Sequence, residues 1–259
     1  MESDEFAQRW LATDHSRQWD VATVVAVCPE GTDATTLRLQ LPVPANFVAG
    51  QYYLVRLRVG TVPAVIEQAY SASSSPWPPS SQIEITVRDV PRGRLSPVLA
   101  RQMVAGDQLH LRGPFGSLTW NEADGDALVM IGAGSGVAPF TSIVRFASAR
   151  QSKVPMALLC SSRERTSILF GELLEELSRR ENWLSVVHTL TRSPSDPWAR
   201  YHRRIDASMI DDVIGGLELR DRTSLSLLFA GPPEMVTSVR RMVATLGIAE
   251  HRIDSEIHV

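Results

Sequence analysis

Cysteine is scarce in this chain of 259 residues, which contains only Cys28 and Cys160. Two thiolates cannot hold a plant-type iron–sulfur cluster, because such a cluster takes four cysteine ligands. The two residues form no C-x-x-C pair, and so little cysteine predicts a cytosolic protein. The six histidines show no metal-ligand spacing, so no metal site is expected.

Positive charge and long apolar runs are also lacking. The formal net charge is -3 and there is no basic tract, which argues against a nucleic-acid-binding surface. No apolar run reaches the length that a membrane-spanning helix needs. The N-terminal sequence MESDEFAQRW is acidic and polar, unlike a secretory signal. We therefore expect a cytoplasmic protein with no membrane span and no nucleic-acid partner.

The most informative stretch covers residues 127–146, ALVMIGAGSGVAPFTSIVRF. An apolar run typical of a buried strand leads through a glycine-rich turn into a pattern typical of a helix. This arrangement points backbone N–H groups and the positive end of a helix dipole at one spot, which suits a phosphate. The turn departs from G-x-G-x-x-G, because Pro139 stands where the last glycine would be. A tight turn without a ligand is the alternative interpretation.

The first half of the chain has the pattern of a β domain. Residues 1–17 are expected to form a leading arm. Alternating and β-branched runs, which predict antiparallel strands, then cover residues 21–27, 36–41, 52–59, 83–88 and 108–113, with one helical stretch at 95–104. Short strands at this spacing predict a small closed antiparallel barrel of six strands over residues 18–120.

Four motifs in this half resemble those of the ferredoxin–NADP reductase superfamily, in particular the flavin domains of bacterial oxygenase reductases. They follow the family's order: FVAGQY at residues 47–52, QAYSASS at 68–74, GRLS at 93–96 and GPFG at 113–116. Taken singly, such segments also occur as an ordinary strand end or a capped helix. The resemblance implies that the barrel holds FAD, with FMN as the alternative flavin.

The chemistry of these motifs agrees with flavin binding, since the Tyr70 ring can lie along a flavin face. One departure is Gln68, because the family usually has an arginine there that clamps the flavin pyrophosphate. Arg88, Arg92 and Arg94 are the candidates to supply the missing charge. The flavin contacts that the resemblance implies are Gln68, Ala69, Tyr70, Ser71, Val87, Arg88, Gly93, Arg94, Leu95 and Ser96.

After residue 126 the pattern changes to alternating strands and helices. The strand-like runs cover residues 128–131, 156–161, 184–190, 225–230 and 253–259, with helical runs at 169–179, 207–214 and 234–246. This alternation predicts a doubly wound parallel sheet over residues 121–259, in which ligands lie beyond the carboxyl ends of the strands.

The carboxyl ends of these strands resemble the nicotinamide domain of the same family. Residues 134–139 are similar to its pyrophosphate turn, and residues 229–235 match its C-G-P-P-x-M pattern except that Ala230 replaces the cysteine. In the family that cysteine, a serine and a glutamate surround the reacting atoms, which implies Ser71, Glu256 and Ala230 as catalytic positions. We expect the Ala230 side chain to face the nicotinamide. The implied nicotinamide contacts are Gly134, Ser135, Gly136, Pro139, Ser162, Arg163, Arg192, Gly231 and Pro232.

The function that the resemblance implies is an FAD-dependent NAD(P)H oxidoreductase. Electrons would pass on to a separate ferredoxin, haem protein or oxygenase component. Arg163 and Arg192 suit a 2′-phosphate, which favours NADPH over NADH. Reduction of a small diffusible acceptor, such as free flavin or a quinone, is one alternative. A flavin-binding subunit without NAD(P)H turnover is another alternative. It is favoured by Gln68 and Ala230, which replace the arginine and the cysteine that are usual in the family.

Overall fold

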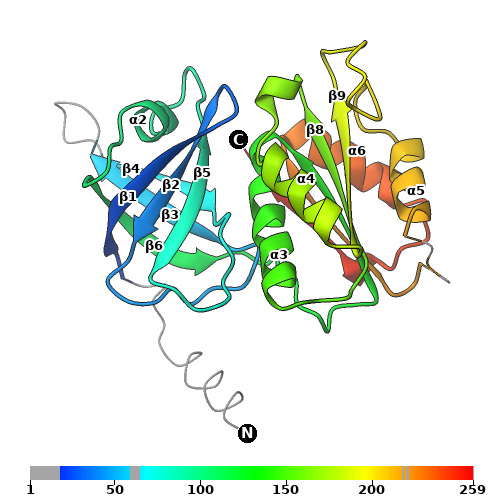
Figure 1. Cartoon of the computed structure of the whole chain (residues 1–259), viewed down its shortest axis with the longest axis horizontal. Coiled ribbons are helices and arrows are strands. Elements are labelled where there is room, and N and C mark those ends of the chain that lie inside the picture. Colours follow the sequence, from blue (N-terminus) through cyan, green and yellow to red (C-terminus); the bar gives the residue numbers. More distant parts are fainter. Residues whose placement is uncertain (1–17, 59–64, 218, 220–221, 259) are drawn as a thin grey trace, which may run out of the picture.

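The computed structural model describes residues 18–58, 65–217, 219 and 222–258. The expected arm over residues 1–17 lies outside the described residues. A β-barrel and a layered α/β domain lie beside each other, as Figure 1 shows. Within the described residues, no helix is both long and apolar enough to cross a membrane.

The barrel contains six antiparallel strands, which confirms the expected N-terminal architecture. They are β1 (Asp20–Glu30), β2 (Ala34–Gln40), β3 (Tyr52–Arg58), β4 (Val65–Ser71), β5 (Gln82–Arg88) and β6 (Gln108–Phe115). The strand order is β4-β3-β6-β1-β2-β5, and a bridge between Ala72 and Ile85 joins the two ends of the sheet. Inward-facing side chains such as Leu37, Leu39 and Ile85 are fully buried and form the barrel core.

Helix α2 (Ser96–Arg101) is shorter than the helix expected over residues 95–104. A turn replaces its last residues, because the Val104 N–H donates to the Asp107 carboxylate at 2.8 Å instead of continuing the helix. Gly106 in this turn has a positive φ of +100°, a conformation that glycine adopts at little cost. The helix therefore ends where local turn chemistry outcompetes it.

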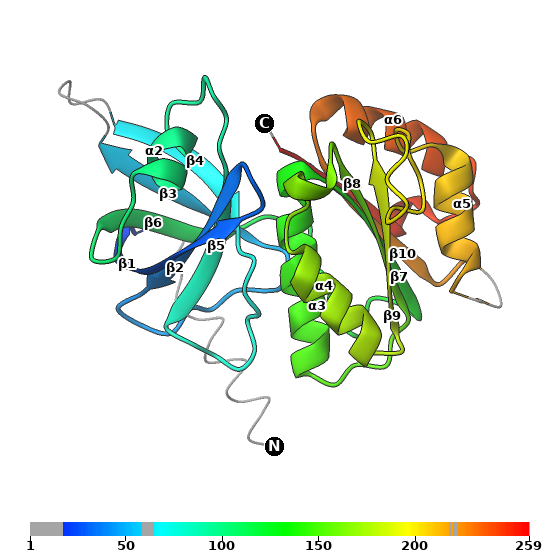
Figure 2. The same ribbon diagram turned by 45° about the horizontal axis from the view of Figure 1, so that its top comes forward.

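The C-terminal half forms the expected doubly wound parallel sheet. Its strands are β7 (Ala127–Ala133), β8 (Met156–Ser162), β9 (Leu184–Leu190), β10 (Leu225–Gly231) and β11 (Ile253–Ile257), in the order β11-β10-β7-β8-β9. Its helices are α3 (Ala138–Ala149), α4 (Gly171–Arg180), α5 (Ala207–Gly215) and α6 (Pro233–Val243). Helices α3 and α4 lie between the sheet and the barrel, and α5 and α6 cover the other face (Figures 1 and 2).

The two halves share apolar and polar contacts. Trp120, which follows the barrel strands, packs against Phe146 of α3 in a cluster that crosses the boundary. The Glu30 carboxylate at the end of β1 accepts a hydrogen bond from the Phe170 N–H at 2.6 Å, at the start of α4. Both contacts join the barrel to the layer formed by α3 and α4, so they hold the two domains against each other. The exact boundary between domains at residues 120 and 121 stays a prediction.

Candidate active site

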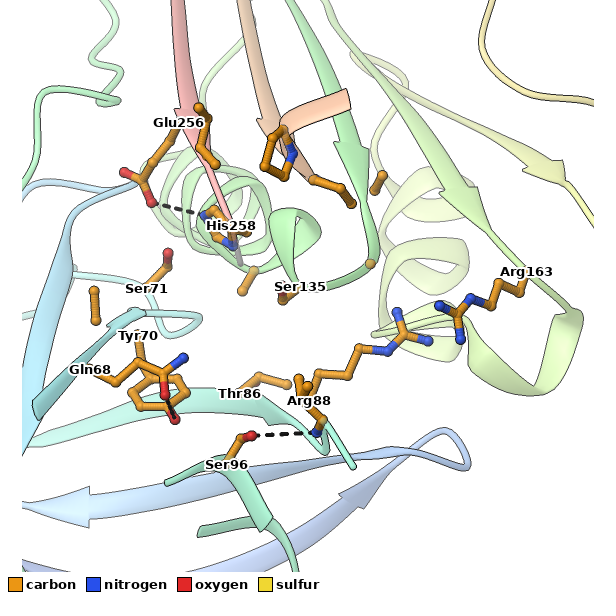
Figure 3. A pocket seen from close by; sticks show the side chains of 18 residues that line it. Gln68, Tyr70, Ser71, Thr86, Arg88, Ser96, Ser135, Arg163, Glu256 and His258 are labelled. Carbon is orange, nitrogen blue, oxygen red and sulfur yellow. Dashed lines mark hydrogen bonds and ion pairs between the residues drawn. The ribbon is translucent and has the colours of Figure 1, made fainter. Parts of the chain in front are cut away.

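A cavity of about 460 Å³ opens between the barrel and the parallel sheet, and Figure 3 shows the side chains that line it. One wall comes from β4, β5 and the start of α2, and the other from the turns after β7 and β10 and the end of β11. The strand order reverses between β7 and β10, so the connections leave these strands in opposite directions. Such a switch point is where doubly wound folds bind ligands.

The cavity brings together many of the residues predicted from the two sets of motifs. Those that line it are Gln68, Ala69, Tyr70, Ser71, Arg88, Ser96, Gly134, Ser135, Arg163, Pro232 and Glu256. The flavin-type motif at 68–74 and the glycine turn at 134–139 therefore meet at one site although they are far apart in sequence. Their direct contact with a cofactor stays a prediction.

The barrel wall presents Tyr70 and Ser71 at the end of β4, and both are buried. Burial raises the pKa of the Tyr70 hydroxyl, which therefore stays protonated at neutral pH. This hydroxyl donates to the Gln68 Oε1 at 3.3 Å and fixes the orientation of the amide. The Gln68 amide nitrogen is left as a neutral donor at the cavity wall (Figure 3).

The glycine turn after β7 is a 3₁₀ turn, η2 (Gly134–Val137), that packs directly on β10. A side chain at Gly136 would overlap the carbonyl group of Ala230. Gly134 has a φ of +58°, and a Cβ there would lie 2.8 Å from a guanidinium nitrogen of Arg88. Close packing against β10 thus explains why residue 136 is a glycine. Glycine at position 134 instead leaves room for the Arg88 guanidinium to approach the turn.

Positive charge gathers at one end of the cavity, where Arg88 and Arg163 extend toward one another (Figure 3). Two nitrogens of the Arg88 guanidinium donate to the Asp33 Oδ2 at 2.9 and 2.7 Å, which orients the group. Arg92 and Arg94, the other candidates for the missing flavin charge, are exposed and do not line the cavity. Of these three candidates only Arg88 lines the cavity, and its contact with a flavin stays a prediction.

The other end of the cavity carries Glu256 and His258, on the side of Ser71 in Figure 3. The His258 Nε2 lies 2.9 Å from the Glu256 Oε1. His258, Thr86 and Pro233 also line the cavity, although none is among the cofactor contacts predicted from the sequence. The available signal for His258 was its spacing of two residues from Glu256 in a terminal strand, because alternate strand residues share a face.

The expectation for Ala230 is wrong, because its side chain does not face the cavity. Ala230 is 0% exposed and belongs to the apolar cluster that contains Val137 and Ala138. The η2 turn covers this end of β10, so a side chain at position 230 points under the turn. The Ala230 side chain therefore forms no part of the cavity wall, and a catalytic role for this position stays a prediction.

Other predicted residues also lie outside the cavity lining. Val87 and Leu95 are fully buried in the barrel core, Pro139 and Ser162 are buried, and Arg192 is exposed. The remaining ones are Gly93, Arg94 and Gly136, which belong to the adjoining turns, and Gly231, which ends β10. The motifs therefore located the turns correctly, while individual residues within them differ in which way they face.

The donor set at this site fits a flavin and a nicotinamide dinucleotide. The volume falls within the range of roughly 300–1,000 Å³ that is usual for small-molecule sites. An aromatic wall, hydroxyl donors and a carboxylate lie toward one end, and two guanidinium groups lie toward the other. Dinucleotides combine flat rings with phosphates, so a cavity of this polarity matches both of their parts.

Comparison with known proteins identifies both domains. An oxidoreductase FAD-binding domain model matches residues 22–120, and an oxidoreductase NAD-binding domain model matches residues 130–241. A solved ferredoxin NADP⁺ reductase from Neisseria gonorrhoeae, with bound FAD and NADP, superposes with a TM-score of 0.79 at 25% identity. That comparison covers 92% of this chain and 98% of the other.

Several relatives with similar sequences are named as components of oxygenase systems. The electron transfer component of 2-halobenzoate 1,2-dioxygenase from Burkholderia cepacia is 30% identical over 247 residues, covering 91% of this chain and 68% of that protein. The ferredoxin–NAD(P)⁺ reductase component of naphthalene 1,2-dioxygenase/salicylate 5-hydroxylase systems from Ralstonia is 27% identical, with coverages of 90% and 67%. This chain thus spans about two thirds of these relatives. It belongs to the ferredoxin–NADP reductase superfamily of FAD- and NAD(P)-binding oxidoreductases.

Proposed function

We propose that this chain transfers hydride from NAD(P)H to a bound FAD and passes the electrons to a separate acceptor. The observation that supports this most is one cavity lined by Tyr70 and Ser71 of the flavin-type motif and by Gly134 and Glu256 of the nicotinamide-type half. Direct hydride transfer needs the reacting atoms about 3–3.5 Å apart, so both cofactors must enter a common space. The cofactors supply the redox chemistry when bound, and the protein binds and orients them.

The barrel side of the cavity is proposed to hold the flavin. Tyr70 offers an aromatic surface that excludes water, and the adjacent Ser71 offers a hydroxyl donor at the same wall. Gln68 offers a neutral amide donor where an arginine is usual in the family. Because a neutral hydrogen bond is weaker than a charge-assisted one, Arg88 is proposed to provide the charge for the flavin phosphates.

The arginine end of the cavity is proposed to hold phosphate groups, since the guanidinium fork matches phosphate oxygens. Arg88 comes from the barrel and Arg163 from the residue after β8, so each domain contributes one cation. A bound dinucleotide would therefore neutralise charge from both domains. This favours a closed arrangement of the two domains around the cofactors.

Preference for NADPH over NADH is proposed to depend on Arg163 more than on Arg192. Both residues are exposed, but only Arg163 lines the cavity. The Arg192 backbone N–H donates to the Arg163 carbonyl at 2.9 Å. We expect Arg163→Gln to raise KM for NADPH about tenfold or more, as loss of a charged hydrogen bond would. Arg192→Gln is the matched control. Equal effects on NADPH and NADH would show that neither arginine reads the 2′-phosphate.

The electron acceptor is proposed to be a protein, such as a ferredoxin, a haem protein or an oxygenase component. The printed names of the relatives describe reductase and electron transfer components of dioxygenase systems, which supports this choice.

The test is a spectroscopic titration of the purified protein after loading with FAD. We expect anaerobic NADPH or NADH to bleach the visible flavin absorbance, and a ferredoxin or haem protein to restore it. Failure to bind either FAD or FMN would contradict the proposal. A bound flavin that never bleaches would favour the non-catalytic subunit. Reoxidation by free flavin or a quinone but by no protein acceptor would favour a diffusible substrate.

A further inference from the structure

His258 is held at the cavity wall through both its backbone and its side chain. Its backbone N–H donates to the Gly231 carbonyl at 2.9 Å, which ties residue 258 to the turn after β10. Its Nε2 lies 2.9 Å from the Glu256 Oε1, and the side chains of His258 and Glu256 are 13% and 22% exposed. The two side chains therefore form a mostly buried pair of fixed geometry at the end of β11.

The strand register explains why this pair faces the cavity. Glu256 is paired with Ala230 and Ile257 with Gly231 in the parallel β10–β11 ladder. Residues two apart in a strand project from the same face, so His258 follows Glu256 toward the cavity. Figure 3 shows both side chains on the wall beside Ser71, away from Arg88 and Arg163.

The hydrogen bond to His258 occupies one of the two carboxylate oxygens of Glu256. The acceptor is a carboxylate, so the histidine nitrogen that faces it carries the hydrogen, in the neutral and in the protonated ring alike. The second oxygen, Oε2, lies 3.7 Å from the place that a Cβ of Gly116 would take, and Gly116 has a φ of +102°. His258 on one side and the Gly116 turn on the other thus bracket the carboxylate.

We propose that His258 is a positioning residue that holds the Glu256 carboxylate in the cavity and so favours the oxidised nicotinamide over the reduced one. This inference rests on the proposed function. The nicotinamide ring is positively charged when oxidised and neutral when reduced, so a carboxylate fixed beside it stabilises the oxidised form. Without the His258 donor, the Glu256 side chain is free to turn toward solvent, and the charge is no longer held beside the ring.

The test uses two dinucleotide probes on the FAD-loaded protein, NADP⁺ with its cationic ring and the unreactive 1,4,5,6-tetrahydro analogue of NADPH with its neutral ring. Dissociation constants are measured by difference absorbance or calorimetry, so no turnover is required. We expect His258→Phe, which keeps a ring but loses the donor, to weaken NADP⁺ binding about tenfold, as loss of a charged hydrogen bond would. Binding of the neutral analogue should change less than about twofold, because its uncharged ring gains no electrostatic attraction from the Glu256 carboxylate.

Two further variants separate positioning from simple packing. His258→Gln keeps an N–H donor, so it should retain most of the NADP⁺ affinity. Glu256→Gln should weaken NADP⁺ binding as much as His258→Phe does, and the double variant should be no worse than Glu256→Gln alone, because both changes remove one interaction. FAD affinity, measured by flavin fluorescence, reports whether the barrel stays intact.

The outcomes distinguish this inference from the proposed function. Equal weakening of both probes in His258→Phe, additive losses in the double variant, or unchanged NADP⁺ affinity would overturn the positioning role alone. If the FAD-loaded wild-type protein binds neither probe, nor their counterparts without the 2′-phosphate, then the proposed function is wrong and the inference falls with it.

Discussion

Glu84 of β5 and Arg145 of α3 form an ion pair of 2.5 Å that joins the barrel to the parallel-sheet domain. Arg145 also donates to the Ser73 carbonyl at 3.0 Å, and Arg38 binds the other Glu84 oxygen at 2.9 Å. Burial disfavours the charged form of Glu84, but the Arg145 and Arg38 guanidinium groups outweigh it, so the pKa of Glu84 is lowered. The domain boundary therefore contains a charged contact in addition to apolar packing.

We expect Arg145→Met to lower the free energy of unfolding by about 2 kcal/mol, because hydrogen bonds to charged groups contribute roughly 1.5–3 kcal/mol. Arg38→Met is the matched control: its side chain is 46% exposed, and an exposed pair contributes about 0.2–1 kcal/mol. Urea denaturation of both variants measures the difference. A loss for Arg38→Met as large as that for Arg145→Met would contradict the importance of the domain-bridging contact.

The η2 turn makes a second prediction, since it leaves no room for a side chain at Gly136. Gly136→Ala would push the turn away from the Ala230 carbonyl, and overpacking of this kind destabilises by about 1–3 kcal/mol. Gly215→Ala is the control, because a Cβ there meets nothing within 4 Å and the residue ends α5. It should be neutral or stabilising. Thermal unfolding distinguishes the two, and a neutral Gly136→Ala would show that the turn can move.

The third prediction concerns the missing charge at Gln68. Gln68→Arg should tighten FAD binding about tenfold, because a charge-assisted hydrogen bond replaces a neutral one. Gln68→Met, which has no donor, should weaken it. Flavin fluorescence during titration of the apoprotein gives both dissociation constants. If the arginine and methionine variants bind FAD equally well, position 68 does not contact the flavin phosphates.

His188 provides a prediction about pH, because its two ring nitrogens are buried without a hydrogen-bond partner among the described residues. Its ring packs on Trp198 at 4.6 Å, and burial lowers its pKa from 6.5 to about 4. The folded state therefore favours the neutral ring. The associated stability is fully present above about pH 6.5 and is lost as the pH falls toward 4.

We expect His188→Phe, which keeps a ring against Trp198, to abolish about 2 kcal/mol of the stability loss between pH 7 and pH 5. Urea denaturation of wild type and variant at both pH values measures this difference. Carboxylates titrate in both proteins, so the comparison isolates the histidine. Identical pH dependence in the two proteins would mean that His188 is protonated in the folded state as readily as in the unfolded chain.

The architecture could be predicted from the sequence because the local periodicity of apolar residues indicates where strands and helices form. Runs such as residues 156–160 and 227–230 are apolar throughout, as is typical of strands covered on both faces, and their alternation with helices specifies a parallel sheet. The ends of elements were harder to predict. Helix α2 stops early because the Asp107 carboxylate binds a backbone N–H, an interaction that the helical pattern does not reveal.

The site was predictable where a motif supplies backbone geometry, and less so where packing decides how a side chain points. Ala230 was placed on the correct strand, but its direction depends on the η2 turn that covers it. The pair of Arg145 and Glu84 is separated by 61 residues and has no local pattern. Contacts of this kind arise only when the domains dock, which residue spacing along one element cannot predict.

The Glu30 carboxylate bonded to the Phe170 N–H has a consequence for engineering by domain exchange. The first turn of α4 receives one of its hydrogen-bond acceptors from the barrel, so part of this helix's capping belongs to the other half of the chain. A chimera that joins the α/β half to a relative's barrel would lose this acceptor unless the donor barrel has an acidic residue at the end of its first strand. The two halves are thus recognisable as separate families but are not freely interchangeable parts.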